Sequence, residues 1–139
     1  MTDILLALHI IGLMMGAGGG FGSMIAARTA LTRPPEQAAV LRSLGPSLAN
    51  FSGAGLILML LTGFALVFVK YNGFAGLPAV FWIKIVFVTT LTLAALATHV
   101  TYGQVRAGNA AAAGRLAALG PVAGLSSILA VIFAVLAFH

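Results

Sequence analysis

Residues 4–27 read ILLALHIIGLMMGAGGGFGSMIAA, a run of 24 residues without an Asp, Glu, Lys or Arg. A bilayer has a hydrocarbon core about 30 Å thick, and a helix needs about 20 apolar residues to cross it. Three more stretches reach that length, at residues 47–69, 79–101 and 117–138. The sequence therefore predicts an all-α integral membrane four-helix bundle that occupies residues 1–139 as one domain.

The overall composition supports the same class. Of 139 residues, 61% are hydrophobic and 6% are charged, whereas an ordinary soluble domain has about 25% charged residues. This composition excludes a soluble enzyme, a nucleic-acid binder and a disordered protein. Because the chain has no cysteine, it has no disulfide, thiolate metal site or iron–sulfur cluster.

The positive charges predict an orientation. Arginines occupy two of the three predicted connections: Arg28, Arg33 and Arg42 in one, Arg106 and Arg115 in the other. By the positive-inside rule both connections face the cytoplasm and both termini lie outside. We expect these cations to contact lipid headgroups. The segment Thr32-Arg33-Pro34-Pro35-Glu36 is typical of a helix start and predicts a short surface helix before the second span.

A short repeat relates the two halves of the chain. Leu-Gly-Pro occurs at residues 44–46 and again at 119–121, an offset of 75 that suggests two tandem helical hairpins. The same offset relates His9 to Lys84, about five residues into the first and third spans. We therefore expect the two ionisable side chains to lie at one depth and to face each other across the bundle.

Ionisable residues inside a span are functional candidates, but each has an alternative interpretation. Lys84 could extend toward the outer headgroups, and His9 could be a neutral ring hydrogen-bonded to a neighbouring helix. His99 lies fifteen residues beyond Lys84, about 22 Å along the helix, so His9 and His99 cannot ligate one haem. His139 is expected at the interface, and a His9–His139 pair requires the C-terminus to fold inward.

The first span also carries a row of glycines. Gly12, Gly16 and Gly20 follow each other at intervals of four, which puts them on one helix face. That face either allows close helix packing or leaves a slot for a flat ring beside His9. The methionines Met14, Met15, Met24 and Met59 are either core residues or thioether ligands for copper.

Several of these residues carry a family resemblance. The stretches concerned are Leu8-His9-Ile10-Ile11 followed by a glycine, Leu61-Thr62-Gly63, Phe81-Trp82-Ile83-Lys84, and His99. In this layout the chain resembles the HemJ-type protoporphyrinogen oxidases and is similar to copper-resistance D-type membrane proteins. The resemblance implies haem b as cofactor, His9 as its iron ligand and a functional role for Lys84. After His9, glycines replace the aromatic residue and the arginine of the family.

Three functional hypotheses follow. The first is a haem-binding, HemJ-like bundle of the bacterial inner membrane, in which Lys84 lies near a propionate or serves as second ligand. The second is a non-catalytic accessory subunit of a larger membrane complex, and the third is copper uptake. A homo-oligomer or a complex with a partner membrane subunit is expected in each case, and nucleic acid is not expected as a partner.

Overall fold

A computed structural model describes residues 2–138 of the chain. It contains four long α-helices: α1 (Thr2–Ala30), α2 (Pro35–Tyr71), α3 (Ala79–Arg106) and α4 (Ala113–Phe138), with the short 3-10 helix η1 (Ala110–Ala112) before α4. The described part of the chain has no strand. The prediction of an all-α four-helix bundle is confirmed, and each predicted span falls within one of the long helices.

Helix α2 differs from its prediction. We expected a short surface helix before the second span, and this is wrong, because α2 continues without interruption from Pro35 through Pro46 to Tyr71. Pro35 fits the first turn, where its missing N–H has no partner to lose. The 37 residues of α2 measure about 55 Å, which exceeds the hydrocarbon thickness. Its first turns therefore extend beyond the hydrocarbon core.

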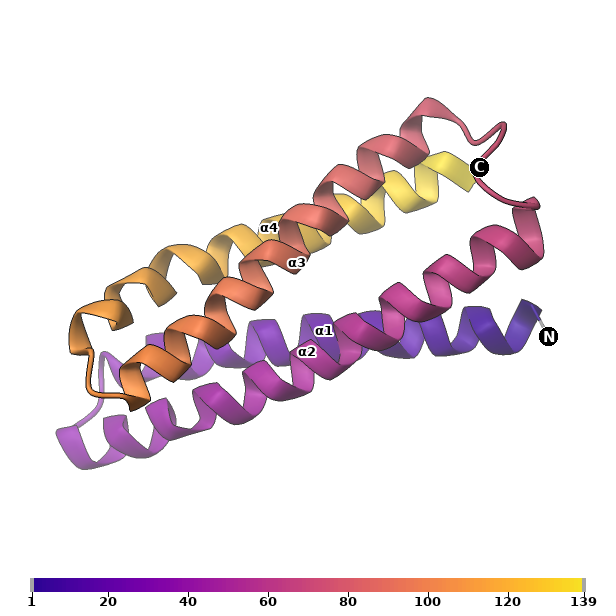
Figure 1. The fold of residues 1–139 in the computed structure, drawn as a ribbon. Coiled ribbons are helices and arrows are strands. Elements are labelled where there is room, and N and C mark those ends of the chain that lie inside the picture. Colours follow the sequence, from indigo (N-terminus) through magenta and orange to yellow (C-terminus); the bar gives the residue numbers. More distant parts are fainter. Residues whose placement is uncertain (1, 139) are drawn as a thin grey trace.

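The helices form two hairpins. Helix α1 packs along α2 and α3 packs along α4, whereas the hairpins meet only sparsely, through α2 with α3 and α1 with α4. Figure 1 shows the two hairpins side by side, with the start of α1 and the end of α4 at the same end of the bundle. The α1–α2 and α3–α4 connections lie at the opposite end. The predicted hairpin pairing is confirmed.

Glycines bring α1 and α2 into close contact. A Cβ atom on Gly12 would lie 2.7 Å from the backbone nitrogen of Met59, and one on Gly55 would lie 2.6 Å from the nitrogen of Gly16. Since real Cβ atoms do not approach backbone that closely, these positions require glycine. The hydroxyl of Ser52 adds a hydrogen bond, donated across the interface to the carbonyl of Gly16 at 2.7 Å.

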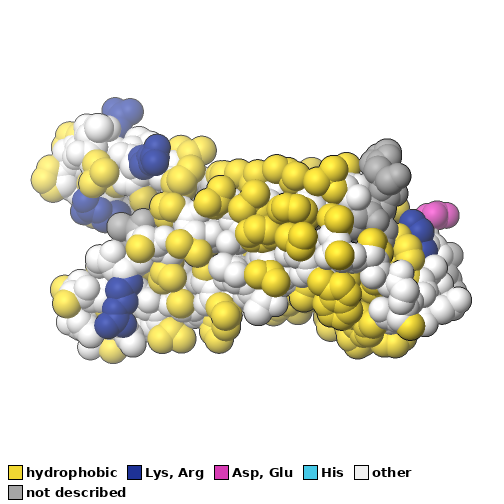
Figure 2. Space-filling view, turned by 90° about the horizontal axis from the view of Figure 1, so that it is seen from above, with side chains coloured by type: hydrophobic (Ala, Val, Ile, Leu, Met, Phe, Trp, Pro, Cys, Tyr) yellow, Lys and Arg dark blue, Asp and Glu magenta, His cyan; other side chains and the backbone are white. Residues whose placement is uncertain are grey.

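The bundle surface matches a bilayer. All four long helices are long and apolar enough to cross a membrane. Figure 2 shows a broad apolar band on one face, with Lys and Arg side chains confined to the two ends of the molecule. Large hydrophobic side chains such as Ile57, Leu61 and Leu93 are about 60% exposed, which costs little when lipid covers them. The chain is a multi-pass membrane protein.

Candidate functional site

A cavity of about 180 Å³ lies between the two hairpins, and all four long helices contribute to its wall. Its polar side chains are His9 from α1 and Lys84 from α3. The remaining wall is apolar, and its largest side chains are Phe64 from α2, Phe74 from the α2–α3 connection and Phe81 from α3. The structure thus brings together the two ionisable residues that the 75-residue offset related.

Helix α2 holds the His9 ring from two sides. A Cβ atom on Gly63 would lie 2.9 Å from Cε1 of His9, so only glycine leaves room for the ring in this position. The ring atom Nδ1 lies 2.9 Å from the carbonyl oxygen of Met59 and 3.1 Å from Oγ1 of Thr62. The Thr62 hydroxyl donates its own proton to the carbonyl of Leu58 at 2.7 Å.

These hydrogen bonds assign the tautomer of His9. A carbonyl oxygen only accepts, so Nδ1 must carry the proton that it donates to Met59. The Thr62 hydroxyl donates its own proton to the carbonyl of Leu58, so its oxygen is an acceptor toward His9. The Nδ1–H group therefore donates a bifurcated hydrogen bond to the Met59 carbonyl and to Thr62 Oγ1. In a neutral imidazole the other nitrogen, Nε2, then keeps its lone pair. A histidine oriented through Nδ1–H to a backbone carbonyl, with Nε2 unprotonated, is the usual arrangement of a metal-ligating histidine.

The Lys84 side chain is half-buried and forms part of the cavity wall. Its Nζ lies 5.5 Å from the centre of the Phe81 ring, within the range of a cation–π contact. Phe81 itself is buried, with 2% of its surface exposed, so its ring forms a fixed part of the cavity wall near the lysine Nζ. In this structure Lys84 contributes a positive group to a largely apolar cavity.

Aromatic side chains cover the end of the cavity near the chain termini. The Phe74 ring packs against Phe64, Phe68 and Trp82, with centroids 6.1, 5.6 and 6.1 Å away. Phe74 follows Gly73, whose φ of 103° belongs to the left-handed region that glycine favours. This role for Phe74 could not be predicted from the sequence, because the residue lies in a connection outside the predicted spans.

The predicted glycine row does not line this cavity. Gly12 and Gly16 face α2, as described above, and Gly20 is exposed, with no heavy atom within 4 Å of an added Cβ. The interpretation of the row as a helix-packing surface therefore describes Gly12 and Gly16 but not Gly20. Ser52 and Thr62 both form hydrogen bonds from α2 to α1, with the Gly16 carbonyl and with Nδ1 of His9 respectively.

The other histidines lie elsewhere. His99 packs against Gly53, where an added Cβ would lie 2.8 Å from Nε2 of the ring. Gly53 and Gly63 are ten residues apart on α2, about 15 Å along the helix, which agrees with the prediction that His9 and His99 cannot share one iron. His139 lies outside the described residues, so the suggested His9–His139 pair does too.

Clustered metal ligands are not found in the described chain. Among residues 2–138, no group of three or more His, Cys, Asp or Glu residues could hold a metal ion. Of the methionines considered as copper ligands, Met59 is buried in the wall beside His9, whereas Met14 is 68% exposed. Any metal in the cavity would therefore depend on His9 as its main nitrogen ligand.

In comparisons with models of protein families, with characterised proteins and with solved structures, nothing matches this chain. The resemblance to HemJ-type oxidases, with haem b as cofactor, stays a prediction.

Proposed function

We propose that this membrane protein binds haem b or a related tetrapyrrole between its two hairpins, where Nε2 of His9 would hold the iron. The observation that carries the proposal is the hydrogen bond from Nδ1 of His9 to the Met59 carbonyl. It fixes the ring orientation and leaves the other nitrogen basic. A haem held by one protein histidine supplies electron-transfer or oxygen chemistry, which the surrounding side chains tune.

The remaining wall suits a flat apolar ring with acidic edges. The phenylalanines Phe64, Phe74 and Phe81 offer aromatic faces, and Lys84 offers an ammonium group for a propionate carboxylate. Such a charge-assisted contact is stronger than a neutral hydrogen bond, and more so in a water-poor cavity. In this role Lys84 orients the ring, while His9 holds the metal.

The cavity must widen for this ligand. Its volume of about 180 Å³ is below the roughly 300–1,000 Å³ that small-molecule sites have. Contacts between the hairpins are sparse, so a separation of α3 and α4 from α1 and α2 would leave the contacts within each hairpin intact. We therefore expect ligand binding to separate the hairpins at the end that Phe74 covers.

The test is the visible absorption spectrum of the protein purified from membranes in mild detergent, oxidised and after reduction with dithionite. A b-type haem gives a Soret band and sharp bands on reduction. His9→Ala should abolish these bands, whereas the matched variant His99→Ala should keep them. Haem retained at full stoichiometry in His9→Ala would overturn the assignment of the ligand. If haem is present, oxidation of protoporphyrinogen is the activity to assay next.

A further inference from the structure

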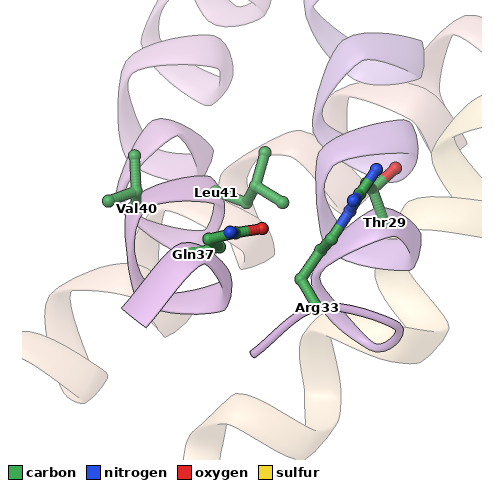
Figure 3. Close-up of a pocket in the computed structure, with 5 residues that line it drawn as sticks. All are labelled: Thr29, Arg33, Gln37, Val40 and Leu41. Atoms are coloured by element: carbon green, nitrogen blue, oxygen red, sulfur yellow. The ribbon is translucent and has the colours of Figure 1, made fainter. Parts of the chain in front are cut away.

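A second hollow lies at the opposite end of the bundle, where α1 turns into α2. It is an open groove of about 370 Å³, lined by Thr29, Arg33, Gln37, Val40 and Leu41. Figure 3 shows the Arg33 guanidinium beside Thr29 on one side of the groove, and the Gln37 amide directed toward them from α2. Val40 and Leu41 complete the wall with apolar surface.

The helix register gives the depth of this groove in the membrane. Gly12 lies opposite Gly55 and Met59, and Gly19 lies opposite Leu48 and Ser52. Extending this antiparallel register brings residue 27, the last of the first predicted span, level with residue 42 of α2. The groove residues 41 and 37 then lie about 1.5 and 7.5 Å outside the hydrocarbon core. The headgroup layer of each leaflet is about 5–8 Å thick, so the groove lies at the level of lipid phosphates.

The charge around the groove favours an anion. Residues 28–46 contain Arg28, Arg33 and Arg42 but only one acid, Glu36. An arginine presents two parallel N–H donors that match phosphate oxygens. The amide of Gln37 and the hydroxyl of Thr29 can donate to further oxygens from the two sides of the groove.

The apolar part of the groove selects a lipid over a free anion. Val40 has 65% of its surface exposed, next to the polar groups and at headgroup depth. A free phosphate would leave this surface in water, whereas the glycerol backbone and first methylenes of a phospholipid would cover it. Leu41, half-buried beside Val40, continues the apolar surface toward α1.

We propose that this groove binds one phospholipid with an anionic headgroup. Arg33 holds the phosphate, Gln37 and Thr29 bind its remaining oxygens, and Val40 covers the glycerol and upper acyl chain. Phosphatidylglycerol fits this site, whereas phosphatidylcholine brings its choline cation toward Arg33. The proposal does not depend on haem binding at the other end of the bundle.

The test is native mass spectrometry of the full chain in detergent, titrated with phosphatidylglycerol or with phosphatidylcholine of the same acyl chains. We expect one phosphatidylglycerol to bind more tightly than phosphatidylcholine. Loss of a charged hydrogen bond predicts that Arg33→Gln weakens binding about tenfold. The matched control is Arg106→Gln, which removes the same charge from the same end of the other hairpin and should leave the affinity unchanged.

Two further variants separate the contributions. Gln37→Leu should weaken binding of phosphatidylglycerol without removing a charge. Val40→Ser should weaken binding of the lipid but not of inorganic phosphate. Equal losses in Arg33→Gln and Arg106→Gln would overturn the site in favour of diffuse attraction between charges. Equal affinity for the two lipids would overturn the anionic selectivity. Displacement of phosphatidylglycerol by millimolar inorganic phosphate would show that the site takes a free anion.

Discussion

Replacing Gly12 by alanine tests how closely the first two helices pack. The added Cβ would lie 2.7 Å from the nitrogen of Met59 and 2.8 Å from the carbonyl oxygen of Gly55. Both atoms belong to backbone, so no side chain can rotate to make room. The whole of α2 would have to shift away from α1 near the middle of the bundle.

The magnitude follows from a comparison with Gly20→Ala. Alanine favours a helix over glycine by about 0.5–1 kcal/mol, and this gain is common to both variants. Gly20 is exposed, with nothing within 4 Å of an added Cβ, so its variant has no packing cost. Overpacking at Gly12 costs about 1–3 kcal/mol. The difference between the two variants should therefore be about 1–3 kcal/mol, with Gly12→Ala the less stable.

The assay is equilibrium unfolding of the purified protein in mixed micelles, followed by far-UV circular dichroism. Gly19→Ala should behave like Gly12→Ala, since its Cβ would lie 2.7 Å from the carbonyl oxygen of Leu48. Equal free energies of unfolding for Gly12→Ala and Gly20→Ala would refute close packing at this interface. That result would favour the other interpretation of the glycine row, as a slot for a ligand.

Three further predictions concern the cavity and the orientation. Thr62→Val removes one acceptor for Nδ1 of His9 but keeps the hydrogen bond to the Met59 carbonyl. The free energy of unfolding should therefore fall by only about 0.6 kcal/mol. A loss above about 2 kcal/mol would contradict this prediction. Phe74→Ala removes the aromatic cover of the cavity, so Lys84 should react faster with an amine-directed reagent. Lys70, the other lysine of the chain, is the internal standard. An unchanged rate would show that Phe74 does not cover the cavity. Asn109→Cys introduces the one cysteine of the chain into the α3–α4 connection. It should react with an impermeant maleimide only when the cytoplasmic face is accessible; labelling from outside would contradict the predicted orientation.

Much of the fold could be predicted from the sequence because bilayer thickness limits the length of an apolar helix. The four spans and the hairpin pairing followed from this limit and from the repeat. The repeat also related His9 to Lys84, and both residues line one cavity. The exception was the start of the second span, where residues 32–36 predicted a separate surface helix but α2 continues through Pro46 to Tyr71. Pro46 leaves the carbonyl of Arg42 without its helical N–H donor, and because that carbonyl lies at the edge of the hydrocarbon core, water can satisfy it and α2 continues.

The parts of the site that the sequence did not reveal depend on contacts between helices. The protonated nitrogen of His9 is set by the register that brings the Met59 carbonyl to its ring. The room for that ring depends on Gly63, which stands out in the sequence only as part of the resemblance motif Leu61-Thr62-Gly63, with nothing to relate it to His9. The position of Phe74 depends on the conformation of a short connection. None of these contacts has a periodic signal in the chain.

Haem titration of the purified, cofactor-depleted protein tests the proposed function most directly. The wild-type chain and His99→Ala should bind one haem each, with a shifted Soret band and an endpoint at one equivalent. His9→Ala should give only the spectrum of haem dissolved in micelles. A wild-type chain that gives that same micellar spectrum, while folded by circular dichroism, would contradict haem ligation by His9.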